Sequence, residues 1–160
     1  MFEALFPGVA HLQNIHPLTV HFPIAFLAGA LLFYALAWLL RRDRLAETAF
    51  ACLALGALSA LVSVGTGLYA EPGVMVSRSV RARLLHQHKE LMLWTASLAV
   101  VLAAWATIFR PLPARGRPLF FFLFLTMLVI MAFGSDYGAR MVYDYNAGGN
   151  ACPQPIEFNR

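Results

Sequence analysis

The stretch that decides the fold is PLTVHFPIAFLAGALLFYALAWLL, residues 17–40, which contains no Asp, Glu, Lys or Arg. A membrane-spanning α-helix needs about 20 consecutive apolar residues, so this stretch is long enough to cross a bilayer. It ends at the charged run Arg41-Arg42-Asp43-Arg44. Pro17 suits the first turn of a helix, whereas Pro23 lies deeper and predicts a kink or loosened first turns. The stretch therefore predicts a transmembrane helix.

Working outward, three further apolar segments follow, at about 48–69, 90–109 and 118–137. The whole chain is 60% hydrophobic and 12% charged, which excludes an ordinary soluble domain. Short connections favour antiparallel neighbours. We therefore expect an all-α transmembrane four-helix bundle over residues 16–145, with both termini on the same face.

The two ends of the chain differ from this membrane domain. Residues 1–14 contain Glu3 and no Lys or Arg, which is not the pattern of a signal peptide. Phe2, Leu5, Phe6 and Val9 have roughly helical spacing, so residues 1–15 are predicted to lie in the membrane interface. Residues 146–160 are expected to form a C-terminal tail.

Four of the five histidines fall in two short clusters, His16 with His21 and His86 with His88. Successive crossings alternate in direction, so both clusters are expected on one face of the membrane. Ionisable side chains at membrane depth are energetically costly and usually functional. These histidines are therefore the main candidates for a site.

Helix geometry limits what the histidines can bind. His16 and His21 differ by about 140° around a helix, and His86 and His88 also diverge, so four imidazoles cannot converge on one ion. Pairing across helices one and three suits heme b, whose iron takes two axial imidazoles. His21 and His88 are the preferred pair, because His21 is deeper and His88 is nearer to its helix. His16 and His86 would support them or hold a second heme.

Heme propionates favour Arg, Lys or Tyr groups near the membrane surface. Asp136 is expected either to pair with Arg140 along the helix or to orient a ligating imidazole. The groups predicted to neutralise propionates or support the ligands are Arg78, Arg81, Arg83, Lys89, Asp136, Tyr137 and Arg140.

Other functions stay open or are excluded. The same histidines would suit a copper or zinc site, or lie in the interface of a non-redox assembly subunit of a larger complex. Phosphate loops, zinc-type cysteine patterns and serine nucleophile elbows are missing from the sequence, which favours an electron-transfer subunit over a stand-alone enzyme. The Lys and Arg residues behind the net charge of +4 lie mostly in short connections, which excludes nucleic acid as a partner.

The charge flanking the first helix predicts the orientation. Arg41, Arg42 and Arg44 follow Leu40 directly, with almost no positive charge before the helix, so this end is expected in the cytoplasm. The histidines would then face the periplasm from a bacterial inner membrane.

Small residues follow one face of the second helix. Gly56, Ser59, Ser63 and Gly67 recur at spacings of three and four. Such a stripe lets helices approach closely in lipid, and it would also leave room for a flat cofactor. Both interpretations stay open.

The segments HPLTVHFPIA (16–25) and GSDYGARMVY (134–143), with a histidine that opens helix three, resemble the DUF2231 family of small bacterial membrane proteins. The similarity runs from about residue 14 to 149, departing at Ala139 and at the extra His86. The resemblance implies four spanning helices, and it matches His16, His21 and His88 to family histidines. Some family members are fused to Rieske-type or c-type cytochrome domains. The resemblance thus implies heme-based electron transfer between such a periplasmic partner and the membrane or its quinones.

Overall fold

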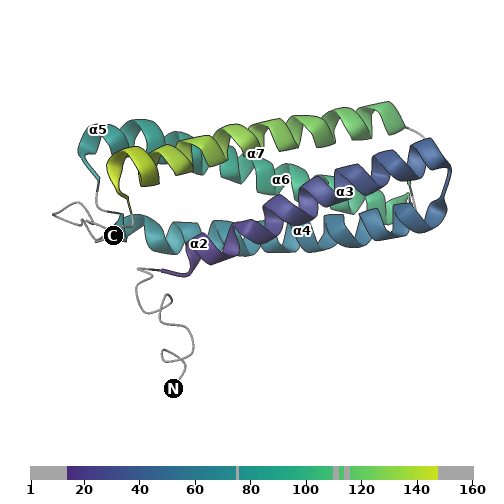
Figure 1. The fold of residues 1–160 in the computed structure, drawn as a ribbon, viewed down its shortest axis with the longest axis horizontal. Coiled ribbons are helices and arrows are strands. Elements are labelled where there is room, and N and C mark those ends of the chain that lie inside the picture. The colour runs from purple at the N-terminus through teal and green to yellow at the C-terminus, as the bar shows by residue number, and fades with distance from the viewer. Residues whose placement is uncertain (1–13, 75, 110–111, 114–115, 148–160) are drawn as a thin grey trace, which may run out of the picture.

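A computed structural model describes residues 14–74, 76–109, 112–113 and 116–147. All regular secondary structure in these ranges is helical. Four helical segments are long and apolar enough to cross a membrane, and they run back and forth as antiparallel neighbours (Figure 1): His16–Leu40, Asp43–Gly73, Arg78–Ile108 and Arg117–Tyr145. The expected all-α four-helix membrane fold is confirmed. The predicted interfacial segment, apart from residues 14 and 15, and the tail beyond 147 lie outside the described residues.

The first helical hairpin consists of α2 (His16–Thr19), α3 (His21–Leu40) and α4 (Asp43–Ala70). The break between α2 and α3 falls at Val20. It follows from Pro23, which has no N–H to donate to the carbonyl of the residue four positions earlier.

The turn after α3 is shorter than expected. Arg41 adopts a left-handed conformation with φ of 52°, and the Arg42 N–H donates to the Ala37 carbonyl at 3.1 Å. The next helix then starts at Asp43 instead of near residue 48. An acidic side chain in the first turn is favoured by the helix dipole. The charged run is therefore a tight turn followed by a helix start.

The second hairpin begins after a short 3-10 turn, η2 (Glu71–Gly73). It consists of α5 (Arg78–Val80), a π-helical turn η3 (Arg81–Leu85), α6 (His86–Ile108) and α7 (Arg117–Tyr145). Helix three thus begins well before residue 90, and helix four continues past its expected end at 137.

Gly134 and Gly138 do not end α7, which continues to Tyr145 although the fourth apolar segment was expected to end at about residue 137. A Cβ added at Gly134 would overlap the Met92 side chain and lie 3.0 Å from the Leu91 Cβ. These glycines allow close approach of α6 to α7, which is the usual role of small residues between membrane helices. The helix continues because packing favours it.

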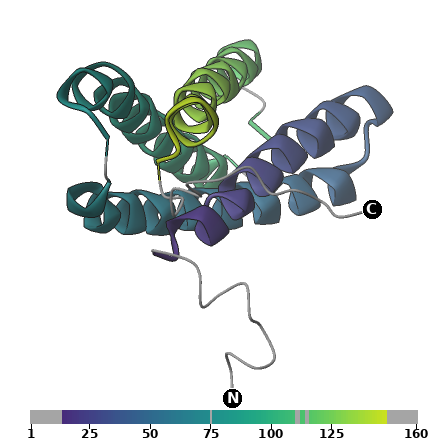
Figure 2. The ribbon, with the colours of Figure 1, turned by 60° about the vertical axis from the view of Figure 1, so that its left-hand side comes forward.

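Aromatic packing joins the two hairpins at the end away from the histidines. Tyr34 of α3 contacts Phe120 and Phe124 of α7, with ring centroids 5.3 and 6.3 Å apart, and all three side chains are fully buried. At the opposite end, a smaller apolar cluster packs the α5–η3 segment against the end of α7. Its members are Val80, Leu84, Leu85, Met141 and Ala147. Figure 2 shows the start of α2, the end of α4, the start of α5 and the end of α7 at this same end.

Candidate functional site

His16 and His88 lie side by side, although they are far apart in the sequence. Their ring centroids are 6.5 Å apart and their planes meet at 81°. His16 belongs to α2 of the first hairpin and His88 to α6 of the second, and both are partly buried. The site is therefore a pair of imidazoles, one from each hairpin.

The His16 ring is anchored by a hydroxyl group. Its Nδ1 lies 3.1 Å from Thr66 Oγ1. The Thr66 hydroxyl donates its single proton to the Ser63 carbonyl at 3.0 Å, so its oxygen is left to accept. His16 Nδ1–H is then the donor, and Nε2 of the neutral ring carries the free lone pair.

The His88 ring is anchored by a backbone group. Its Nδ1 lies 2.7 Å from the Gly134 carbonyl oxygen, which only accepts, so Nδ1 again carries the proton. Within the described ranges, neither Nε2 atom forms a hydrogen bond. Metal-binding histidines typically donate one ring N–H to a carbonyl or similar group and bind with the other nitrogen.

Each ring also lies against a glycine of the next membrane-spanning segment. A Cβ added at Gly67 of α4 would be 2.9 Å from His16 Cε1, and one added at Gly138 of α7 would be 3.0 Å from His88 Cε1. Any larger residue would displace the ring. Gly67 is the end of the small-residue stripe, and Gly56 at its other end faces the Leu27 side chain. At these two positions the stripe serves side-chain packing.

The two remaining membrane histidines take other positions. His21 is exposed at the start of α3, because the angular offset that separates it from His16 turns it away from α4. The preferred pairing of His21 with His88 is therefore not the one in the structure. His86 is also exposed, with Nε2 3.2 Å from Glu90 Oε1.

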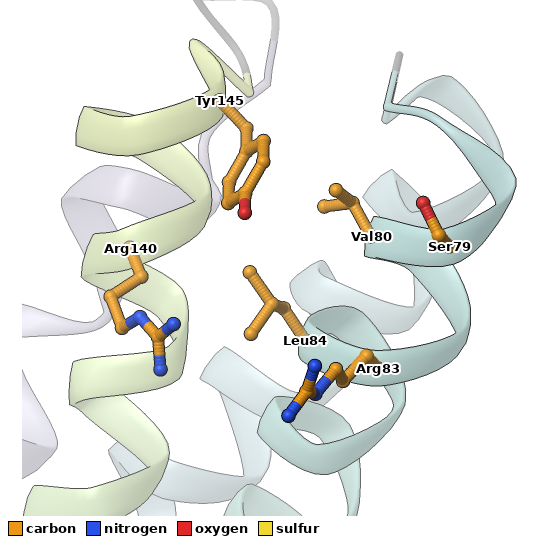
Figure 3. Close-up of a pocket in the computed structure, with 6 residues that line it drawn as sticks. All are labelled: Ser79, Val80, Arg83, Leu84, Arg140 and Tyr145. Atoms are coloured by element: carbon orange, nitrogen blue, oxygen red, sulfur yellow. The ribbon is translucent and has the colours of Figure 1, made fainter.

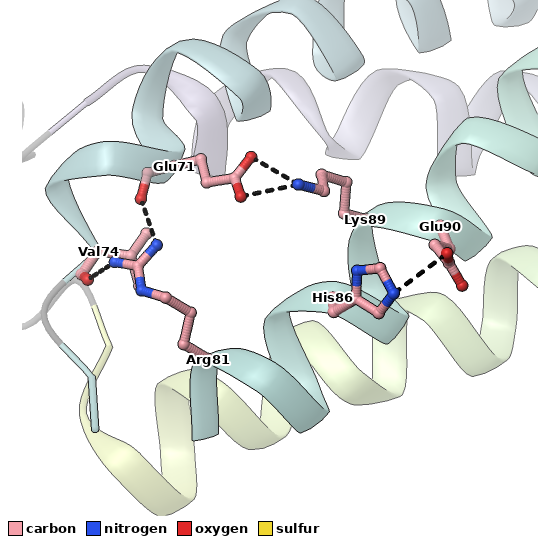
Figure 4. Close-up of polar contacts among 6 residues, drawn as sticks. All are labelled: Glu71, Val74, Arg81, His86, Lys89 and Glu90. Carbon is pink, nitrogen blue, oxygen red and sulfur yellow. Dashed lines mark hydrogen bonds and ion pairs between the residues drawn. The ribbon is translucent and has the colours of Figure 1, made fainter. Parts of the chain in front are cut away.

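Two predicted propionate partners are engaged elsewhere. Lys89 Nζ lies 2.8 Å from Glu71 Oε1, and Arg81 donates to the main-chain carbonyls of Glu71 and Val74 at 3.3 and 2.7 Å (Figure 4). Both cations hold the α4–α5 connection against the second hairpin. Arg78, by contrast, is exposed.

The groups on α7 also differ from expectation. Arg140 Nε is 3.7 Å from Asp144 Oδ2, so the expected pair with Asp136 is not formed. Asp136 is exposed, and the Gly134 carbonyl orients His88 instead. Tyr137 packs against the small apolar cluster.

Sequence reasoning missed the groups that hold the rings. In the sequence, Gly67 was visible only as a member of the small-residue stripe and Gly138 only as part of the segment 134–143. Thr66 had no distinguishing signal. The Gly134 carbonyl is a backbone atom, so no residue type could have identified it. The pairing of each ring with its anchor depends on helix packing.

Comparison with known families agrees with the fold. Residues 12–151 match the model of a family described as "Predicted membrane protein (DUF2231)". This match covers most of the chain, and the protein therefore belongs to the DUF2231 family, as the sequence resemblance implied. Neither a curated protein nor a solved structure matches the chain.

Proposed function

We propose that this DUF2231 protein binds one heme b between its hairpins, with His16 and His88 as axial ligands, and acts as an electron-transfer subunit. The observation that carries the proposal is the pair of anchored imidazoles, whose Nε2 atoms are free and whose ring centroids lie 6.5 Å apart. Metal–imidazole bonds are about 2.0–2.1 Å long, so two rings that bind one metal from opposite sides have centroids about 6 Å apart. The observed separation fits this arrangement.

The donor set favours heme over a bare metal ion. Zinc sites need at least three protein ligands. Within the described parts of the chain, no group of three or more His, Cys, Asp or Glu side chains could hold a metal ion. A porphyrin brings four nitrogens of its own and needs only two axial ligands. Two imidazoles thus suffice for heme and not for zinc.

The chain's own residues would bind and orient the group. Thr66 and the Gly134 carbonyl keep both Nδ1 atoms protonated, so both Nε2 lone pairs are available without loss of a proton. Gly67 and Gly138 hold the rings close to α4 and α7. A bound heme supplies reversible one-electron chemistry, at a potential set by its ligands and their hydrogen bonds.

The proposed location is a bacterial inner membrane, with the histidine end toward the periplasm. Arg41, Arg42 and Arg44 gather at the opposite end of the helices, which suits the cytoplasmic side. Two of the positive charges at the histidine end are already committed to the α4–α5 connection. The electron partners would be a periplasmic c-type cytochrome or Rieske-type subunit and, within the membrane, quinone.

The experiment is a reduced-minus-oxidised absorption spectrum of the purified protein, which should show a b-type α-band. His16→Ala and His88→Ala should each abolish the band, whereas His21→Ala and His86→Ala should retain it as matched controls. A band lost in His21→Ala and kept in His16→Ala would instead support the pairing predicted from the sequence. If the wild-type protein carries copper or zinc and no heme, a copper or zinc site replaces the heme proposal. If it carries neither heme nor metal, the function as an assembly subunit is favoured.

A further inference from the structure

A second site lies at the histidine end of the bundle, between the α5–η3 segment and the last turns of α7. It is a pocket of about 210 Å³ lined by Ser79, Val80, Arg83, Leu84, Arg140 and Tyr145 (Figure 3). Val80 and Leu84 are buried members of the small apolar cluster. The pocket therefore has an apolar base that is part of the folded bundle.

Two arginines line this pocket from facing helices. Figure 3 shows Arg140 on α7 and Arg83 on η3, with their guanidinium groups on opposite sides of the opening. Within the described residues, Arg83 forms no hydrogen bond or ion pair. In the described part of the chain, the one carboxylate near Arg140 is that of the exposed Asp144, at 3.7 Å, which is longer than a hydrogen bond. The two positive charges are therefore poorly neutralised, unlike those of Arg81 and Lys89.

Two hydroxyl groups also line the pocket, those of Ser79 and Tyr145, and the Ser79 hydroxyl lies 3.1 Å from Ser77 Oγ. Figure 3 shows the Tyr145 side chain with its hydroxyl directed toward the space between the two helices. Among the residues that the structure describes, no carboxylate lines the pocket. Guanidinium forks match the oxygen atoms of phosphate groups and bind them with paired hydrogen bonds. The pocket thus presents donors suited to a phosphate.

Exposed tyrosines place the pocket near the surface of the bilayer. Tyr69 and Tyr143 are 87% and 85% exposed at the same end of the bundle. Tyrosine is enriched at the level of the lipid headgroups, whose phosphate groups pair with Arg and Lys side chains. A phosphate group, whether in a lipid headgroup or free in solution, can reach the pocket there.

We propose that this pocket binds a phosphate group through Arg83, Arg140 and Tyr145. The proposal does not depend on heme, because neither His16 nor His88 is among the described residues that line the pocket. A phosphate held by Arg83 of η3 and Arg140 of α7 would link the two helices, so binding should stabilise the packing of η3 against α7.

The test measures thermal stability of the full-length protein in maltoside detergent, with phosphatidylglycerol or inorganic phosphate added at constant ionic strength. We expect a ligand-dependent rise in Tm. The Arg83→Gln/Arg140→Gln double variant should bind at least tenfold more weakly. Arg78→Gln, which removes an exposed positive charge at the same end, should bind as the wild type. A rise with the lipid alone identifies a headgroup, and a rise with inorganic phosphate identifies a soluble phosphate compound.

Three results would overturn the proposal. One is no Tm change with either probe, and another is an equal loss of binding in Arg78→Gln, which would indicate general surface charge. The third is loss of heme absorbance in the double variant with phosphate binding unchanged, which would assign these arginines to heme propionates. The Arg83→Lys/Arg140→Lys double variant keeps both positive charges and removes the guanidinium forks. If its Tm without ligand equals that of the wild type and its phosphate binding is weaker, the proposal is supported even if the Gln variant does not fold.

Discussion

Each helical hairpin holds one imidazole against a glycine of its second membrane-spanning helix, α4 in the first hairpin (α2 to α4) and α7 in the second (α5 to α7). The two hairpins anchor the ring differently. His16 donates to the side chain of Thr66, whereas His88 donates to the main-chain carbonyl of Gly134. A hydroxyl can be removed by substitution and a carbonyl cannot. The same ring placement is thus reached by two chemical routes, and the routes should respond differently to mutation.

The largest expected effect comes from adding a methyl group where helices of one hairpin touch. Gly56→Ala would place a Cβ 2.6 Å from Leu27 Cδ2 and 3.2 Å from the Leu27 nitrogen, and Gly134→Ala would overlap Met92. We expect each variant to lose about 1–3 kcal/mol of unfolding free energy, measured by detergent or thermal unfolding. Only Gly134→Ala should also lower heme content, because it shifts the anchor of His88.

Gly29→Ala is the control for both variants, since a Cβ at Gly29 meets nothing within 4 Å. Its stability should equal or exceed that of the wild type, because alanine favours a helix over glycine. Gly134→Ala protein as stable as Gly29→Ala would contradict the close contact of α6 with α7.

Thr66→Val tests the hydroxyl anchor of the first hairpin. The change keeps the shape and removes the acceptor for His16 Nδ1–H, so heme affinity should fall about 10- to 100-fold, as for other groups that orient metal ligands. Titration of heme into the apoprotein measures this, and Thr66→Ser should restore most of the affinity. Thr107→Val, which removes an exposed hydroxyl of α6, should bind as the wild type. Unchanged affinity in Thr66→Val would show that this hydroxyl does not hold the ring.

Gly67→Ala and Gly138→Ala test whether the two hairpins place their rings equally. Each added methyl group would push an imidazole out of its preferred rotamer, at an energetic cost of about 0.5–1.5 kcal/mol. Heme affinity should therefore fall about two- to tenfold in both variants. Gly65→Ala is the matched control on α4, because its Cβ would meet open space. A loss in one variant alone would mean that only one ring rests on its glycine.

The smallest effect is expected at the connection between the hairpins. Glu71→Gln removes the charge that pairs with Lys89, a partly exposed ion pair. This ion pair should contribute at most about 1 kcal/mol to the free energy of unfolding, and less at high salt. Unfolding measured at low and high salt checks this. A larger loss that persists in high salt would show that the pair is desolvated.

The sequence predicted the membrane class and the four helices well, because long apolar runs have few alternatives in a bilayer. It predicted helix ends less well. Pro23 disturbed the first helix as expected, whereas Gly134 and Gly138 did not end the fourth. A proline lacks a donor in any context, but a glycine ends a helix only when packing does not favour its continuation.

By itself, the sequence determined that the chain crosses the membrane four times and that both histidine clusters lie at one end. Those properties follow from apolar length and from the alternation of crossings, which depend on the chain alone. Only the tertiary structure decided that His16 instead of His21 meets His88, and that Arg83 and Arg140 share a pocket. Those pairings depend on how each helix is rotated about its axis, and that rotation is set by contacts such as Gly67 with His16 and Gly138 with His88.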